Sequence, residues 1–231
     1  MSKKTSHGEL VITSLLRGFL WADWQFVRAR IDLEQSKLMA EQRTTPSLLV
    51  QELLVSGEDH RHGKHCGFDV IAISRALWRR LSRQSREGAS TIEQQVVRVI
   101  TGRYERTLSR KLREIGLAIL VASNYPKELL PAIYLSIGYY GWKMNGYEAA
   151  CKRLGLSSKA LSLTDAANIV ARLKYPHPKN LSKIRGEQIE RRVRHLKWLY
   201  QTHSKTGTYR HLHVSAIRNS ATTFDPVPRT G

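Results

Sequence analysis

Acids, histidines and glycines are concentrated between Gly57 and Asp69, within a chain that is otherwise rich in apolar helical spacing. The segment opens with two adjacent acids, Glu58 and Asp59. A carboxylate that is partly shielded from water can take up and release protons near neutral pH. The segment therefore predicts a proton-transfer site, and a polar loop without catalytic function is the alternative. Its histidines, His60, His62 and His65, match no standard zinc spacing and give little support to a metal site.

A second candidate runs from Gly88 to Gln95, where small residues precede an apolar helical pattern. Ser90 or Thr91 is expected at the helix cap, and the backbone N–H groups of a helix N-terminus can hold an anion. Simple capping explains the two hydroxyl residues but not the adjacent Gln94 and Gln95.

The third candidate is a helix face on which Arg106, Arg110 and Glu114 recur every four residues, with Lys111 beside them. Arg110 and Glu114 alone would form an intrahelical ion pair worth about 0.2–0.5 kcal/mol. By itself, such a pair needs no functional explanation.

In this order, the three segments resemble the transglycosylase module of class A penicillin-binding proteins and of monofunctional peptidoglycan glycosyltransferases. The first motif of that family is E-D-x-x-F-x-x-H-x-G, the second is G-G-S-T-I-T-Q-Q with a basic residue following, and the third is R-K-x-x-E after an R-T pair. The matching residues are Glu58, Asp59, His65, Gly67, Gly88, Ser90, Thr91, Ile92, Gln94, Gln95, Arg98, Arg106, Thr107, Arg110, Lys111 and Glu114. Arg191 and Arg192 with Leu196 resemble the fifth motif, so the resemblance covers roughly residues 46 to 200.

The chain departs from the family pattern at several positions. His62 replaces the aromatic residue of the first motif, and Glu93 replaces a threonine of the second. The fourth motif, I-L-E-x-Y-L-N, loses its glutamate at Ala132 and its asparagine at Ser136, and a further family glutamate appears as Ala122. These departures bear on activity more than on fold, because both principal carboxylates are retained.

The resemblance implies an inverting glycosyltransferase that polymerises lipid II into glycan strands and releases polyprenyl pyrophosphate. It implies Glu58 and Glu114 as catalytic residues, with Glu58 as the base, and a divalent cation, Mg²⁺ or Mn²⁺, as a cofactor that Glu114 would help to bind. The residues implied for substrate binding are Asp59, Ser90, Thr91, Gln94, Arg98, Arg106, Arg110 and Lys111.

The resemblance also implies a mainly α, lysozyme-like bilobal fold in which Glu58 and Glu114 face one cleft. The implied partners are lipid II, the growing glycan strand, a membrane surface and proteins of cell-wall synthesis. The implied location is the outer, periplasmic face of the cytoplasmic membrane. No apolar run in the sequence reaches the ~20 residues of a membrane-spanning helix, and no signal peptide is evident.

Three alternatives remain at this stage. A glycan-cleaving enzyme would use a carboxylic acid to protonate a glycosidic oxygen, but it would need no phosphate-binding cations. A noncatalytic homologue that binds lipid-linked precursors or cell-wall partner proteins is consistent with the losses at Ala122, Ala132 and Ser136. A nucleic-acid-binding protein is indicated only by the formal charge of +19, and no nucleic-acid motif accompanies that charge.

Helices must position these residues, because apolar side chains recur at helical spacing through most of the 231 residues and alternating strand patterns are scarce. Residues 1–43 are predicted to form an amphipathic helical lead-in with Leu15, Leu16, Phe19, Leu20, Trp24 and Phe26 on one broad face. Residues 44–200 are predicted to form the glycosyltransferase domain. Residues 201–231 are predicted to form a polar, loosely held C-terminal tail.

Overall fold

The computed structural model describes residues 7–72, 74, 78, 90–158 and 160–213. Three features predicted from the sequence lie partly outside these residues. They are the lead-in at residues 1–6, the second motif at Gly88 and Ala89, and the predicted tail at residues 214–231.

The described chain is mainly helical, as predicted. Its helices are α1 (His7–Phe19), α2 (Trp21–Met39), α3 (Leu48–Glu58), the 3₁₀ turn η1 (His62–Lys64), α5 (Ile92–Thr101), α6 (Leu108–Asn124), α7 (Leu130–Ile137), α8 (Tyr147–Arg153), α9 (Leu163–Lys174) and α10 (Lys183–Ser204). Strands β1 (Tyr139–Gly141) and β2 (Met144–Asn145) pair antiparallel in a short hairpin.

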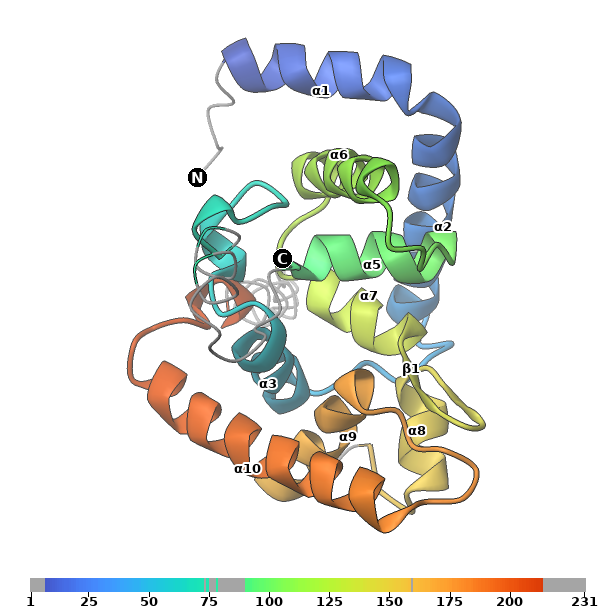
Figure 1. Cartoon of the computed structure of the whole chain (residues 1–231), viewed down its shortest axis with the longest axis vertical. Helices are drawn as coiled ribbons and strands as arrows, with labels where there is room; N and C mark the ends of the chain where they lie inside the picture. Colours follow the sequence, from blue (N-terminus) through green and yellow to red (C-terminus); the bar gives the residue numbers. More distant parts are fainter. Residues whose placement is uncertain (1–6, 73, 75–77, 79–89, 159, 214–231) are drawn as a thin grey trace, which may run out of the picture.

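The helices form two groups that meet along α3 and α7. In one group α5 packs on α6 and α7, and α1 and α2 lie against their outer side. In the other group α3, α9 and α10 pack on one another, with α8 beside α9 (Figure 1). This arrangement agrees with the predicted bilobal architecture, and the first motif follows the end of α3 where the two groups meet.

Several helices begin at a hydroxyl residue that caps the first turn. The side chains of Thr91 and Thr107 accept hydrogen bonds from the backbone N–H groups of Gln94 and Arg110, at the starts of α5 and α6. Ser162 forms a capping box with Asp165 at the start of α9. Such caps satisfy the backbone N–H groups that the first turn of a helix leaves without partners. Thr91 and Thr107 therefore determine where α5 and α6 begin.

The prediction that the lead-in presents one apolar face was wrong. The chain bends at Leu20, between α1 and α2, and the apolar side chains divide between two surroundings. Leu20 and Trp24 are buried, whereas Leu15, Phe19 and Phe26 are exposed.

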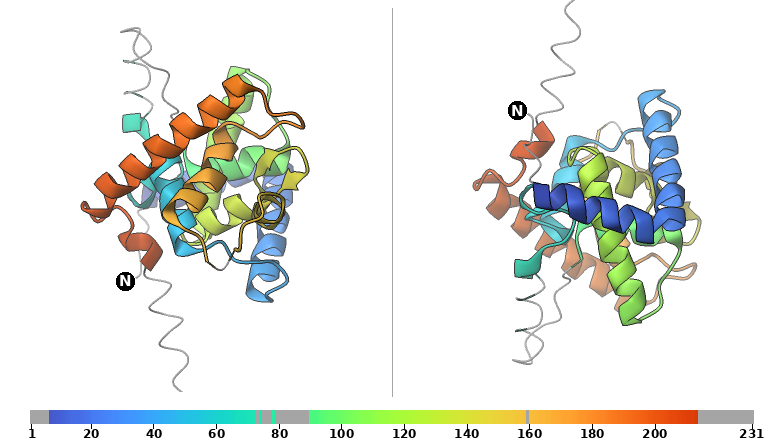
Figure 2. Two further views of the ribbon diagram at one scale, coloured as in Figure 1. Left: turned by 90° about the horizontal axis from the view of Figure 1, so that it is seen from below. Right: turned by 90° about the horizontal axis from the view of Figure 1, so that it is seen from above.

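Helix α1 crosses α6, as the right-hand view of Figure 2 shows. A Cβ atom at Gly116 of α6 would lie 2.8 Å from a methyl group of Leu20 and 3.3 Å from one of Leu16. The glycine therefore permits the close approach of the two helices.

The described part of the predicted tail is packed rather than loosely held. Helix α10 continues to Ser204, and beyond it Tyr209 and Leu212 are buried. The ring of His213 bonds the Glu52 carboxylate at 2.8 Å. Residues 201–213 thus extend the core beside α3. The sequence did not indicate this packing, because the segment is mostly polar and only a few of its side chains, such as Tyr209 and Leu212, are buried.

Candidate active site

A cleft of about 760 Å³ lies where the two groups of helices meet. Its walls come from the end of α3, from α5 and α7, and from α9 and α10. The polar and charged side chains of its lining include Glu58, Ser90, Arg98, Tyr134 and Arg192.

Glu58 is the last residue of α3 and lines this cleft. Arg192 of α10 donates to its Oε1 atom at 2.8 Å and to the carbonyl of Gly57 at 2.7 Å. The Glu58 side chain is 17% exposed. Arg192 therefore holds the carboxylate in place while Oε2 remains the second oxygen through which Glu58 can accept a proton.

Tyr134 of α7 lines the cleft near Glu58. Burial and, to a smaller extent, the negative charge of Glu58 raise the pKa of Tyr134 well above its ordinary value. The phenol is therefore protonated at neutral pH and can serve as a hydrogen-bond donor in the cleft.

Glu114 of α6 is surrounded by three cations. Arg98 binds it with two parallel hydrogen bonds, Nε to Oε2 at 3.0 Å and Nη2 to Oε1 at 2.9 Å. Lys111 donates to Oε1 at 2.6 Å, and Arg110 donates to Oε2. One buried carboxylate thus orients three cationic side chains, and the cluster keeps an excess of positive charge.

The ionisation of this cluster follows from its contacts. Burial raises the pKa of Glu114, but hydrogen bonds from Arg98 and Lys111 outweigh it and leave that pKa below the ordinary value. Burial also lowers the pKa of Lys111, and its contact with Glu114 opposes the change. Arg98 and Lys111 both donate to Ser90 Oγ at 3.2 Å, so their positive charges converge at the cleft wall. An anionic group in the cleft would be stabilised there.

Two comparisons with known proteins bear on what this cleft does. The family model described as Transglycosylase matches residues 26–199. The chain belongs to the transglycosylase family. That match begins within α2 and ends in α10, so it includes the residues that line the cleft and all the described helices except α1 and the ends of α2 and α10.

Individual relatives are similar over shorter segments. A monofunctional glycosyltransferase of Staphylococcus saprophyticus is 40% identical over 42% of this chain, and a biosynthetic peptidoglycan transglycosylase of Salmonella arizonae is 34% identical over 53% of it. Penicillin-binding protein 1A of Vibrio cholerae is 33% identical over 64% of it. The matched segments span 36%, 52% and 18% of these relatives' own lengths.

The structure brings several of the predicted transglycosylase residues together. Glu58, Ser90 and Arg98 line the cleft. Arg110 and Lys111 join them through Glu114, and Gln94 joins through Lys111, which donates to its Oε1 at 2.6 Å. Glu114 was expected to face the cleft, but it is buried and does not line it; it contacts Arg98, which does.

Two predicted substrate-binding residues have structural roles instead. Asp59 is buried behind the cleft, where it bonds His65 and the backbone N–H of Ile92. Thr91 is also buried, where it caps α5 and donates to the Gly67 carbonyl at 2.7 Å. Substrate contact in the cleft is therefore not supported for either residue, because both are buried and neither lines it.

Arg106 is exposed before α6 and does not belong to the cleft lining. Its predicted role in substrate binding is therefore unsupported by its position. A metal ion at Glu114 is also disfavoured, because both carboxylate oxygens accept hydrogen bonds from three cations. We assign no step to an ion there.

Arg192 and Tyr134 were missed as site residues, although both lay in recognisable motifs. Arg192 belongs to the segment that resembles the fifth motif, and the tyrosine of the fourth motif is Tyr134. The sequence signal was present in each case, but only the fold shows that helices α7 and α10 bring these side chains to Glu58.

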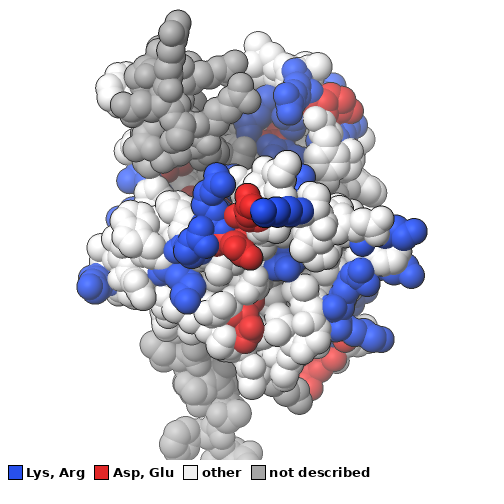
Figure 3. Space-filling view, turned by 60° about the horizontal axis from the view of Figure 1, so that its bottom comes forward, with Lys and Arg blue, Asp and Glu red and all other residues white. Residues whose placement is uncertain are grey.

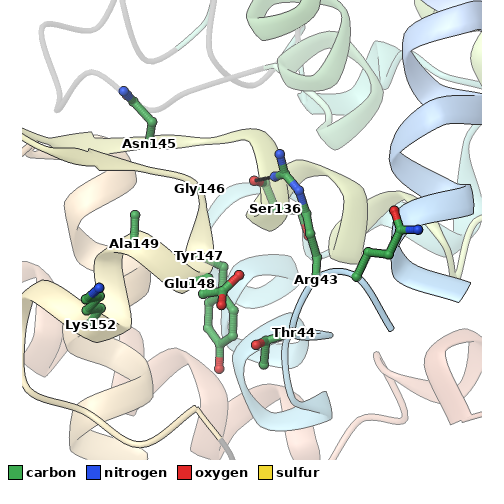
Figure 4. Close-up of a pocket in the computed structure, with 10 residues that line it drawn as sticks. Arg43, Thr44, Ser136, Asn145, Gly146, Tyr147, Glu148, Ala149 and Lys152 are labelled. Atoms are coloured by element: carbon green, nitrogen blue, oxygen red, sulfur yellow. Dashed lines mark hydrogen bonds between the residues drawn. The ribbon is translucent and has the colours of Figure 1, made fainter. Parts of the chain in front are cut away.

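Neither departure in the fourth motif, at Ala132 or at Ser136, lines the cleft. Ser136 is buried and its hydroxyl group donates to the carbonyl of Ala132 at 2.9 Å, so this hydroxyl is hydrogen-bonded within α7. Ser136 also lines a second hollow, of about 410 Å³, where Arg43 donates to its carbonyl at 3.0 Å (Figure 4). This hollow shares no lining residue with the cleft, so the loss at Ser136 leaves the wall around Glu58 intact.

Proposed function

We propose that this chain is a peptidoglycan glycosyltransferase that polymerises lipid II, with Glu58 as the catalytic base. The observation that carries the proposal is that Glu58 and Arg98 line one cleft, with the cation cluster around Glu114 behind Arg98. A proton acceptor and a site for a pyrophosphate are the two features that transfer of a sugar from a polyprenyl pyrophosphate requires.

In this reaction a sugar hydroxyl of the lipid II acceptor attacks the anomeric carbon of the growing glycan. The new bond joins the acceptor oxygen to that carbon, and the hydroxyl proton passes to Glu58. The bond from the anomeric carbon to the pyrophosphate oxygen breaks on the opposite side, with inversion. Polyprenyl pyrophosphate leaves with the electron pair of that bond, and Arg98 and Lys111 stabilise its negative charge.

The charge of the cleft supports transfer over glycan cleavage. Hydrolysis of a glycan strand releases no phosphate, so a cleaving enzyme would have no use for three cations oriented by one glutamate. The wall around Glu58 likewise favours an active enzyme over a noncatalytic homologue, because neither Ala132 nor Ser136 lines the cleft.

The proposal includes contact with a membrane surface at the outer face of the cytoplasmic membrane. None of the helices described is long and apolar enough to cross a membrane. Helix α1 instead exposes Val11, Ile12, Leu15 and Phe19, and Trp21 follows them. Such a helix can insert its apolar side chains at the headgroup boundary while the domain remains in water. Figure 3 shows Lys and Arg spread over the end of the molecule away from α1, so the contact through α1 rests on its apolar side chains and not on that charge.

The direct test is incubation of the purified chain with fluorescent lipid II in detergent or vesicles, with products separated by length on a gel. We expect glycan strands and the release of one polyprenyl pyrophosphate for each bond formed. Lipid II that is bound but not polymerised would favour the noncatalytic homologue, and shortening of preformed glycan strands would favour a glycan-cleaving enzyme.

A further inference from the structure

Four side chains that the proposed reaction does not use gather behind the first motif. Asp59, His62, His65 and Glu93 each offer a nitrogen or oxygen ligand atom, and these atoms lie within 4.8 Å of one another. The first three follow α3, and Glu93 lies in the first turn of α5. His62 and Glu93 are fully buried.

The two departures from the first and second motifs meet in this cluster. His62 stands where the first motif has an aromatic residue, and Glu93 stands where the second has a threonine. His62 Nδ1 lies 3.5 Å from a Glu93 oxygen and 3.5 Å from Asp59 Oδ2. Two separate changes have therefore added an imidazole and a carboxylate to one buried location.

The hydrogen bond of His62 leaves one ring nitrogen available. Its Nε2 atom lies 2.9 Å from the carbonyl of Lys127 and must donate, because a carbonyl only accepts. Its Nδ1 atom is buried and has no hydrogen-bond partner in the described structure. A metal-bound histidine typically donates its other ring N–H to such an acceptor. The orientation of His62 is thus the one that a metal ligand needs.

The spacing also fits a small divalent ion. Two ligands that each lie ~2.1 Å from a tetrahedral ion are about 3.4 Å apart, close to the two 3.5 Å distances from His62 Nδ1. The Oε2 atom of Glu93 is buried without a hydrogen-bond partner in the described structure, and it offers a second oxygen to an ion.

His65 and Lys127 surround these three groups. His65 Nε2 bonds both Asp59 oxygens, at 3.1 and 2.9 Å, while its Nδ1 accepts from the Gly67 N–H at 3.3 Å. The Lys127 ammonium bonds Glu93 Oε1, and its side chain is 12% exposed. The single positive charge of Lys127 cannot neutralise the two negative charges of Asp59 and Glu93. A divalent ion would neutralise both carboxylates, and the Lys127 ammonium would then move into solvent.

We propose that His62 Nδ1, Asp59 and Glu93 bind one divalent ion of the zinc type, while His65 holds Asp59 in position. Imidazole with carboxylates suits Zn²⁺ and the neighbouring first-row ions, including Co²⁺. The ion would tie the segment after α3 to the start of α5, behind the wall that carries Glu58. This inference does not depend on the transferase activity.

The test is a titration of tag-free, chelator-stripped full-length protein with Co²⁺, followed by visible absorption. We expect a band that saturates at one ion per chain, that Zn²⁺ displaces, and that accompanies a rise in Tm. H62F and E93T restore the motif residue types, so each should fold and lower the Co²⁺ affinity at least ~100-fold. H60F, a histidine change outside the cluster, should leave the affinity unchanged.

K127M is a variant that should raise the Co²⁺ affinity rather than lower it. Met has a similar length without the competing ammonium, so this variant should bind Co²⁺ more tightly than wild type does. Absence of saturable Co²⁺ binding by wild type would overturn the proposal. A band that persists in both H62F and E93T, or weaker binding by K127M, would also overturn it. Should H62F fail to fold, E93T and K127M still decide the result.

Discussion

The two principal acids, Glu58 and Glu114, have different surroundings and therefore different tasks. Glu58 lies at the end of α3, is held by Arg192 and faces the cleft. Glu114 lies within α6 and bonds Arg98, Arg110 and Lys111. Their surroundings make Glu58 the candidate for proton transfer and make Glu114 a positioning residue that acts through the cations it orients.

The position of the basic residues predicts unequal effects on turnover. R98A should lower kcat for lipid II polymerisation about 10²–10³-fold, because Arg98 lines the cleft and would meet the leaving pyrophosphate. R106A should change kcat less than about tenfold, because the charge of Arg106 is exposed and screened. Equal losses in the two variants, measured with matched Tm values, would contradict this placement of the phosphate site.

The motifs could predict which residues are functional but not which way each side chain points. Glu58 and Asp59 are adjacent in one motif, yet Glu58 faces the cleft and Asp59 is buried on the other side of the wall. The reason is that α3 ends between them and the backbone of Asp59 becomes extended, with φ −158°. A spacing pattern contains no information about that change.

Among the elements, the segment after α3 is held closely against α5 and α6. The Gly67 carbonyl accepts a hydrogen bond from Thr91 at the cap of α5. Gly67 has φ +103°, and a Cβ atom there would lie 2.3 Å from the Ala118 carbonyl oxygen of α6. The glycine of the first motif is therefore required by both backbone conformation and space.

This contact predicts that G67A lowers the free energy of unfolding by about 2–5 kcal/mol, since the variant would add backbone strain and a steric overlap. G155A is the matched control, because Gly155 has φ +66° but no atom within 4 Å of the added Cβ. Its cost should be about 1 kcal/mol, from backbone strain alone. Denaturant unfolding of the two variants would check this, and equal costs would contradict the close approach of Gly67 to α6.

The positions of α5 and α6 could be read from their capping residues, whereas the bend between α1 and α2 could not. Apolar side chains continue on both sides of Gly18 and through Leu20, so their spacing predicted one face. Packing of α1 on Gly116 of α6 determines the bend, and that contact joins residues nearly a hundred positions apart.

At the scale of the whole molecule, two groups of helices enclose the cleft, and residues 201–213 close the core beside α3. L212A should lower the free energy of unfolding by about 2–5 kcal/mol, because Leu212 is buried. L108A should change it by less than about 0.5 kcal/mol, because Leu108 is 76% exposed. Thermal or denaturant unfolding would measure both, and an unaffected L212A would restore the interpretation of this segment as a loosely held tail.

The exposed apolar side chains of α1 predict a second whole-molecule property. The double variant L15S/F19S should bind vesicles of anionic lipid more weakly than wild type, because it removes two large apolar groups from the proposed membrane face. Its Tm should change little, since both side chains are exposed. Co-sedimentation with the vesicles is the measurement, and unchanged binding would exclude α1 as the membrane contact.

The most direct test of the central claim is polymerisation of lipid II by E58Q beside wild type, with lipid II binding measured in parallel. Glutamine keeps the shape of Glu58 and its contact with Arg192 but cannot take up the acceptor proton. We predict that E58Q binds lipid II and polymerises it at least about 10²-fold more slowly. Polymerisation by E58Q at the wild-type rate would show that Glu58 is not the base.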